Sequence, residues 1–192
     1  MAEPLEDAVE SENKKVALII AILALFLAFA EAGAKNAEHF ATEKNIEASD
    51  LYNFYQAKRI RSTVVEAAEQ ALEATRPGIA DPAAKDAADK QIEAWKAEIA
   101  RFEKDPKTPE DSMDAIIERA KAAGEARELS NRKLEHFEYA SGALQIAIVL
   151  ASAAIITGMA TLAWLAAALG GAGVVIMAFG VLAPTALPIF GG

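Results

Sequence analysis

The stretch YASGALQIAIVLASAAIITGMATLAWLAAALGGAGVVIMAFGVLAPTALPIFGG, residues 139–192, contains no Asp, Glu, Lys or Arg in 54 consecutive positions. A helix needs roughly 20 apolar residues to cross the hydrocarbon core of a bilayer. The run is therefore long enough for two crossings, and the glycine-rich segment LGGAG supplies a break near its middle. We expect transmembrane helices over 140–168 and 174–192, joined by a glycine turn at 169–173.

A second apolar run, VALIIAILALFLAFA, follows Lys14 and Lys15, and extends to residue 34 if Glu31 lies at the membrane interface. It predicts a first transmembrane helix over 16–34, preceded by an acidic tail over 1–15. A secretory signal peptide also has a short apolar run that ends in small residues, but it begins with basic residues. Because this tail is acidic, we expect an uncleaved anchor.

The polar region 35–139 lies between these apolar runs and has a helical pattern. Proline and glycine predict breaks near 76–82 and 105–109, which leaves helices over 34–75, 83–104 and 109–139. Thr108 followed by Pro109 is typical of a helix start. No helix breaker separates the first and last of these helices from the adjacent spans. The sequence therefore predicts an all-α integral membrane protein, with a long, coiled-coil-like soluble stalk between its first and second transmembrane helices.

Composition excludes several kinds of chemistry. The chain has no cysteine, so it forms no disulfide, thiolate metal site or thiol nucleophile. Its formal net charge is −9, and no basic cluster rises above the acidic background. We therefore expect no nucleic-acid partner.

One face of the first stalk helix carries a heptad-spaced seam in which cations interrupt apolar residues. Its members are Leu51, Phe54, Lys58, Arg61, Val65, Ala68 and Leu72. We expect Leu51, Phe54 and Tyr55 to pack the stalk, and Lys58 and Arg61 to set its register by pairing with acids on another helix. The alternative interpretation makes the aromatic rings and the two cations an anion-binding site.

Small residues recur along the second predicted span at spacings of four and three. They are Ala147, Ala151, Ala154, Gly158 and Thr161. Helices in lipid associate where small side chains let their backbones approach closely. This strip predicts a helix partner, either another span of the same chain or a span of a neighbouring subunit.

Two histidines, His39 and His136, lie where the predicted helices meet the membrane, and with nearby glutamates they are candidate metal ligands. Neither follows a glutamate by three residues, as the helix-bundle di-iron pattern requires. No nucleophile elbow, phosphate-binding loop or dinucleotide fingerprint occurs in the sequence. We therefore expect no metal, no cofactor and no enzymatic activity.

The segment ASDLYNFYQAKRIRS, residues 48–62, resembles the signature of the bacterial membrane family catalogued as domain of unknown function 4337. Members typically read Asp, then Trp and Tyr, then Tyr-Gln-Ala-Lys, and here Asp50, Tyr55, Gln56 and Lys58 occupy those places. Tyr52 replaces the usual Trp, and Phe54 replaces a Tyr. A second matching block is HFEYASGALQIAIVLASAAI, residues 136–155. The resemblance implies three membrane helices around a helical soluble region, and it implies no activity.

These patterns together favour a non-enzymatic assembly or scaffold protein of the bacterial inner membrane. We expect it to contact lipid, and to be a homo-oligomer or an accessory subunit of a larger membrane complex. Basic residues near the membrane ends of the stalk, such as Lys35 and Lys133, favour a cytoplasmic stalk. The alternative is a small homo-oligomeric channel or transport component, with Glu31 or Gln145 near the pathway.

Overall fold

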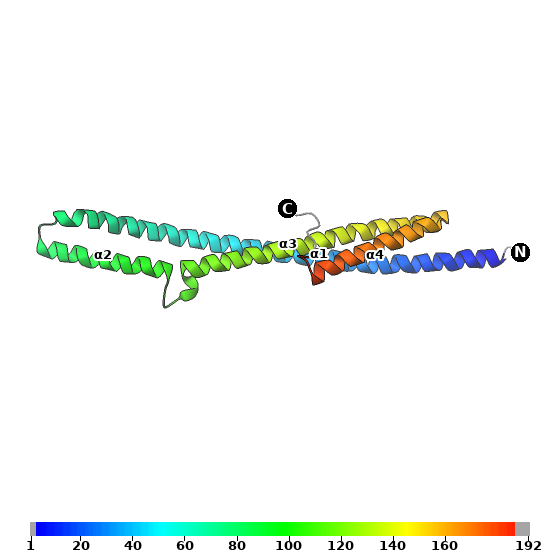
Figure 1. Cartoon of the computed structure of the whole chain (residues 1–192), viewed down its shortest axis with the longest axis horizontal. Helices are drawn as coiled ribbons and strands as arrows, with labels where there is room; N and C mark the ends of the chain where they lie inside the picture. The colour runs from blue at the N-terminus through cyan, green and yellow to red at the C-terminus, as the bar shows by residue number, and fades with distance from the viewer. Residues whose placement is uncertain (1–2, 187–192) are drawn as a thin grey trace. The chain divides into compact units, whose positions relative to one another are not determined.

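The computed structural model describes the backbone of residues 3–186 and the side chains of residues 14–186. Its elements are α1 (Glu3–Thr75), the 3-10 turn η1 (Arg76–Gly78), α2 (Pro82–Glu103), the 3-10 turn η2 (Pro109–Asp111), α3 (Met113–Thr157) and α4 (Ala160–Leu182), as Figure 1 shows. No strand occurs in residues 3–186, which confirms the all-α prediction.

The helices form two compact units. The apolar unit consists of Met1–Thr42 and Arg127–Gly192, and the polar unit consists of Glu43–Ala126. α1 and α3 each contribute to both units, whereas α2 belongs to the polar unit and α4 to the apolar unit.

Local capping explains where α2 and α3 begin. The Asp81 side chain accepts hydrogen bonds from the backbone N–H groups of Ala83 and Ala84 at the start of α2. Thr108 precedes only the short η2 turn, and its hydroxyl caps nothing there. The Ser112 hydroxyl instead accepts a hydrogen bond from the backbone N–H of Ala115, so α3 begins at Met113 rather than at Pro109.

The turn between the last two helices lies elsewhere than predicted. α3 ends at Thr157, and Gly158 turns the chain with a φ of +68°, a conformation that favours glycine. α4 then runs unbroken through 169–173, so the predicted spans 140–168 and 174–192 and the predicted glycine turn are wrong in their boundaries. Glycines inside an apolar helix serve close packing as readily as they serve turns.

The apolar unit packs α1, α3 and α4 around small and aliphatic side chains. Its buried cluster contains Leu23, Ala30, Ala140, Leu144 and Ala147. Partly buried side chains from all three helices surround this cluster, among them Phe26, Ile148 and Met177.

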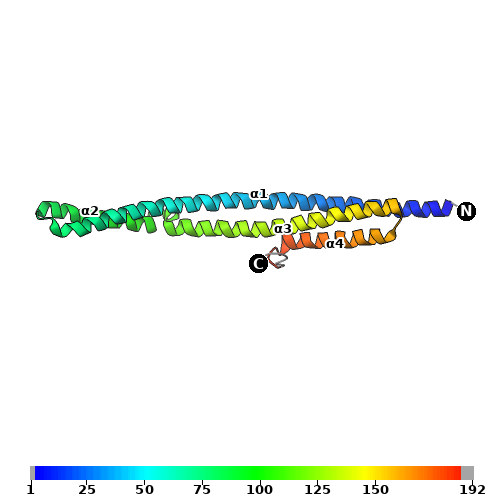
Figure 2. The same cartoon turned by 90° about the horizontal axis from the view of Figure 1, so that it is seen from above.

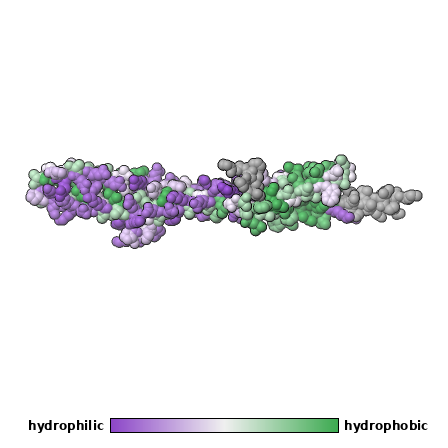
Figure 3. Space-filling model, viewed as in Figure 1, coloured by the Kyte–Doolittle hydropathy of each residue, from purple (hydrophilic) through white to green (hydrophobic). Residues whose placement is uncertain are grey.

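Most of the apolar surface of this unit faces outward. α1, α3 and α4 each contain a segment that is long and apolar enough to cross a membrane. Leu18, Val149, Ile156 and Leu182 are between 62% and 85% exposed. Figure 3 shows hydrophobic residues gathered over α4 and the neighbouring part of α3. Soluble monomers rarely expose a continuous apolar surface of this kind.

In the polar unit, α2 and the start of α3 both pack against α1. Figure 2 shows α2 running alongside the last part of α1, to which η1 connects it. α2 buries Ala88 and Ile92, whereas the start of α3 places Ile116 and Ala120 in a cluster with Leu51 of α1. The two interruptions of the helical pattern in this unit, residues 76–81 and 104–112, coincide with the predicted breaks.

The seam of α1 runs through different residues from those that the heptad pattern predicts. Leu51 and Ser62 are buried and Tyr55 is partly buried, while Phe54 is 43% exposed and Arg61 lies at the surface. The inward seam is therefore Leu51, Tyr55, Lys58, Ser62, Val65, Glu69 and Leu72. The predicted and the observed seam share Leu51, Lys58, Val65 and Leu72. At the three positions between these, the observed seam residue follows the predicted one by one position in the sequence.

Candidate assembly surfaces

The strip of small residues on α3 is largely used within the chain. Ala147 and Ala151 are fully buried, and Ala154 is 6% exposed. The other two members leave the strip, because Gly158 forms the turn and Thr161 lies exposed on α4. The sequence left open whether this strip packs against a span of the same chain or of a neighbouring subunit. Among the described residues, it packs within the same chain.

Glycines on α1 and α4 allow the close helix contacts of the apolar unit. A Cβ added to Gly180 would lie 2.8 Å from the His136 Cβ, and one added to Gly173 would lie 3.1 Å from the Ala140 carbonyl oxygen. A Cβ on Gly33 would overlap the ring of Phe137. These contacts require the absence of a side chain, as expected where helices pack in an apolar solvent.

Lys58 contacts the backbone rather than an acid. Its ammonium group donates a hydrogen bond to the Asp111 carbonyl oxygen at the end of η2, and lies 5.2 Å from the centre of the Phe54 ring. Lys58 thus joins α1 to the segment that precedes α3 through a charge-assisted hydrogen bond, whereas its cation–π contact with Phe54 lies within α1. The predicted pairing of Lys58 with a carboxylate is therefore wrong, although the predicted contact with another segment is present.

Arg61 pairs with nothing among the side chains that the structure describes. It lies on the surface of α1, as do Asp50 and Gln56 of the same motif. The depression beside this stretch is lined by Glu43, Glu47, Asp50 and one cation, Arg119, together with apolar side chains. This acidic surrounding does not favour the anion-binding alternative for Lys58 and Arg61.

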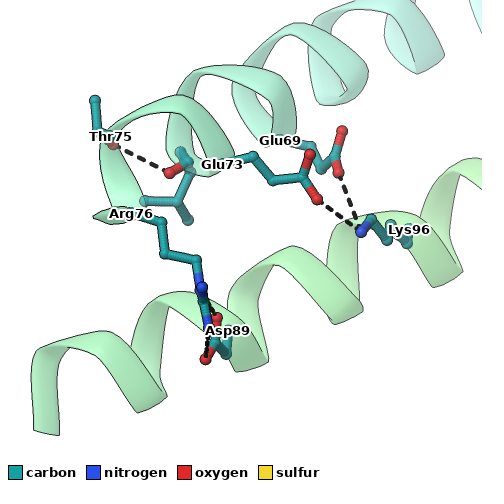
Figure 4. A network of polar contacts seen from close by, with 7 residues as sticks. Glu69, Glu73, Thr75, Arg76, Asp89 and Lys96 are labelled. Carbon is teal, nitrogen blue, oxygen red and sulfur yellow. Dashed lines mark hydrogen bonds and ion pairs between the residues drawn. The ribbon is translucent and has the colours of Figure 1, made fainter. Parts of the chain in front are cut away.

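Ion pairs join α2 to the end of α1 and to η1, and so hold these segments of the polar unit in register (Figure 4). Arg76 donates two hydrogen bonds to Asp89, and the one from Nη2 to Oδ2 measures 2.7 Å. Lys96 reaches back from α2 to Glu73 at 2.8 Å and to Glu69 at 3.7 Å. The hydrogen bond from Arg76 lowers the pKa of Asp89, and the one from Lys96 lowers the pKa of Glu73.

These pairs could have been inferred from the sequence. Arg76 and Asp89 flank the turn between two helices, at positions that an antiparallel hairpin brings together. The register-setting cations of this unit are therefore Arg76 and Lys96, which the heptad pattern does not single out because they lie outside the seam.

A second apolar stripe runs along the opposite side of α1 and lies uncovered. Its members, which we call the outer stripe, are Ile46, Asn53, Ala57, Ile60, Val64, Ala67 and Ala71. From Asn53 onward the spacing alternates between four and three, as in a coiled-coil seam. Every member is exposed, and Ile46, Ile60 and Val64 are 56%, 58% and 63% exposed.

Helix geometry places the outer stripe about 160° around α1 from the inward seam, at roughly 100° per residue. α2 and the start of α3 occupy the seam side, where Leu51 and Glu69 are buried. The outer stripe is thus an uncovered apolar face of α1 in the polar unit. Sequence reasoning missed it because one heptad pattern had already been assigned to α1.

The two histidines have different surroundings. His39 is exposed, and His136 is 4% exposed. His136 Nδ1 lies 2.7 Å from the Arg132 carbonyl oxygen, so this nitrogen donates the hydrogen bond, and Nε2 has no partner among the described residues. No group of three or more His, Asp or Glu side chains within residues 14–186 is arranged to hold a metal ion, so the candidate ligands His39 and His136 do not belong to such a group there.

Glu31 and Gln145, the polar residues considered for a transport pathway, lie together. The Gln145 amide donates hydrogen bonds to the Glu31 carboxylate at 3.5 Å and to the Ser141 hydroxyl at 3.3 Å. Glu31 and Gln145 are exposed on the surface of the apolar unit. They form a polar contact that joins α1 to α3.

Comparison with known proteins identifies the family. No curated protein and no solved structure matches the chain. The family described as Domain of unknown function (DUF4337) matches residues 12–183, which include the segment 48–62, the outer stripe and all three apolar helical segments. The chain therefore belongs to the family of domain of unknown function 4337.

Proposed function

We propose that this chain is a non-enzymatic assembly protein of the bacterial inner membrane that associates with copies of itself through the outer stripe. In this proposal the apolar unit crosses the bilayer three times, and residues 35–139 lie in the cytoplasm. An accessory role in a larger membrane complex uses the same surface with a different partner.

The outward-facing apolar surface supports the membrane placement. Its three helices expose large aliphatic and aromatic side chains that a bilayer would cover. α4 has 23 residues, which corresponds to about 35 Å and exceeds the roughly 30 Å hydrocarbon core. Lys35 and Lys133 lie at the ends of the polar region and favour the cytoplasmic side.

The outer stripe is the observation that carries the proposal. Water surrounds the polar unit in this arrangement. Exposure of Ile46, Ile60 and Val64 to water is therefore unfavourable, and a partner that covers them gains free energy of association. Fully burying an exposed aliphatic side chain contributes about 1.5–3 kcal/mol, and covering the exposed part of each of these contributes roughly half of that. A stripe at spacings of four and three accepts another helix with the same spacing, and an identical copy supplies that helix by a two-fold axis.

Asn53 identifies a second copy as the favoured partner. It lies within the outer stripe, flanked by Ile46 and Ala57. A single asparagine in a coiled-coil seam pairs with the same asparagine of a second chain and thereby specifies register, at some cost in stability. Against an unrelated apolar helix, the same amide would be buried without a partner.

Single cysteines test this proposal cleanly, because the chain has none of its own. We expect Ile60→Cys to form an intermolecular disulfide in mild detergent, because equivalent seam positions meet in a parallel pair. Arg59→Cys is the matched control, since it is equally exposed but points away from the outer stripe. Mass measurement by light scattering should give an oligomer for the unaltered chain and a monomer for the double variant Ile60→Lys, Val64→Lys.

A monomeric unaltered chain that co-purifies with no other subunit would contradict the proposal. Co-purification of a different protein that the double variant loses would instead support the accessory role. Equal cross-linking at residues 59 and 60 would show contact without a specific seam.

The polar contact between Glu31 and Gln145 supports the second candidate, a homo-oligomeric channel or transport component. A carboxylate on the surface of an apolar helix is costly unless a neighbouring subunit or water covers it. Ion or solute flux into liposomes should then fall with Glu31→Gln and with Gln145→Leu. Flux that is unaffected by both substitutions would remove the reason for this candidate.

A further inference from the structure

One end of the apolar unit contains a cavity of about 310 Å³. α1 contributes Lys15 and Ile19, the end of α3 contributes Ala154, and the turn and the start of α4 contribute Met159, Ala163 and Trp164. Apart from the Lys15 ammonium group and the indole N–H of Trp164, the lining side chains are apolar. The cavity therefore combines a hydrophobic wall with one cation.

We propose that this cavity binds an anionic phospholipid, with its phosphate on Lys15 and part of an acyl chain against Ile19, Ala163 and Trp164. This inference rests on the membrane placement proposed above, but not on self-assembly.

The position of the cavity along the helices agrees with the depth of a lipid headgroup. Lys15 immediately precedes the apolar run of α1, and the turn at Gly158 and Met159 ends the apolar segment of α3. Trp164 is the fifth residue of α4, so it lies about 6 Å along the helix axis from the first residue of α4. Tryptophan and lysine are enriched at this level of a membrane, where an apolar layer meets a charged one.

Lys15 presents its charge at the surface. Lys15 makes no ion pair or hydrogen bond to any side chain within residues 14–186, and it is exposed. A single lysine near a membrane surface contributes about 1 kcal/mol to the binding of anionic lipid, which corresponds to roughly fivefold. A zwitterionic lipid would offer the same acyl chain, but no net charge to Lys15.

Trp164 provides a direct readout, because it is 77% exposed and lines the cavity. The other tryptophan, Trp95, lies in the polar unit and can be replaced by Phe. The full chain with Trp95→Phe would be reconstituted in vesicles of phosphatidylglycerol and phosphatidylcholine of one fixed composition. Only one of the two lipids would carry brominated acyl chains in each preparation, and quenching of Trp164 would be compared at equal mole fraction.

We expect brominated phosphatidylglycerol to be preferred about fivefold over brominated phosphatidylcholine at Trp164. Lys15→Gln should remove this preference, whereas the matched control Lys14→Gln should leave it within twofold, because Lys14 does not line the cavity. Ala163→Leu should also remove the preference by filling the cavity, and its far-ultraviolet circular dichroism would verify that the helices persist.

Equal quenching by both lipids in the unaltered chain, or a preference that survives Lys15→Gln, would overturn the lipid site and leave the membrane placement intact. Absence of quenching by either lipid would overturn the membrane placement as well. Disulfide cross-linking between copies that carry Ala163→Cys would assign the cavity to a second chain, and would also overturn the proposal.

Discussion

The apolar unit and the polar unit hold their helices together by different contacts. In the apolar unit, alanines and glycines such as Ala140 and Gly173 bring helix backbones close. In the polar unit, Leu51, Ile116 and Ala120 form a small buried cluster, and Arg76 and Lys96 add ion pairs to neighbouring segments. The difference is that expected between packing in lipid and packing in water.

Truncating one buried aliphatic side chain in each unit gives the largest expected effect. Ile116 and Leu144 are both fully buried. Ile116→Ala should lower the local free energy of unfolding by about 2–5 kcal/mol, because it loses both transfer free energy and packing. If lipid surrounds the apolar unit, Leu144→Ala loses packing but no transfer free energy from water. It should therefore lower the local free energy of unfolding by no more than about half as much as Ile116→Ala does. Hydrogen exchange of the full chain in detergent, read separately for peptides from each unit, measures both losses. Equal losses would indicate that the apolar unit packs as a water-soluble core does.

A smaller effect is expected from adding a methyl group to a glycine of α4. Gly180→Ala should destabilise the apolar unit by about 1–3 kcal/mol, because the new Cβ would meet the Cβ of His136, which is fixed to the backbone. Gly171→Ala is the matched control, since nothing lies within 4 Å of its Cβ position. It should be neutral, or stabilising by up to about 1 kcal/mol through helix propensity. Thermal unfolding in detergent would distinguish the two, and a destabilising Gly171→Ala would show that glycine itself, rather than close packing, is required.

The smallest expected effect concerns acid and salt. Asp89 and Glu73 have lowered pKa values in the folded chain because Arg76 and Lys96 donate hydrogen bonds to them. The stabilisation is complete above the pKa values of the unfolded carboxyl groups, and is lost as the pH falls through the lowered values of the folded state. The polar unit should therefore loosen at acid pH before the apolar unit does. High salt should produce the same loosening at neutral pH. Hydrogen exchange at two ionic strengths measures the effect of salt on the polar unit. Asp89→Asn should abolish the share of the acid and salt effects that comes from the pair with Arg76.

The sequence predicted the helical class, the three apolar segments and the two interruptions of the polar region, because charge and proline mark these features directly. It misplaced the last turn, because LGGAG contains three glycines whereas Gly158 stands alone. A glycine count does not distinguish a glycine that turns the chain from Gly170 or Gly173, which make room for Leu23 and Ala140.

The heptad register of α1 failed for a related reason. Phe54 is more apolar than Tyr55, and Arg61 is longer than Ser62, so composition alone favours 54 and 61 over their neighbours. Ser62 can be buried because its hydroxyl donates a hydrogen bond to Glu66 at 2.9 Å, and Tyr55 packs against Ile116 and its neighbours. The partner of Tyr55 is set by the position of the start of α3, which the pattern of α1 alone does not contain.

The tight turn at Gly158 and Met159 has a consequence for how such a chain enters a bilayer. The segment that links α3 to α4 has only these two residues and carries no charge. In the membrane placement proposed above, no charged residue lies between the crossings made by α3 and α4. The paired helices α3 and α4 can then insert together as one hairpin. Their apolar side chains favour insertion, and no polar loop between them has to cross the hydrocarbon core.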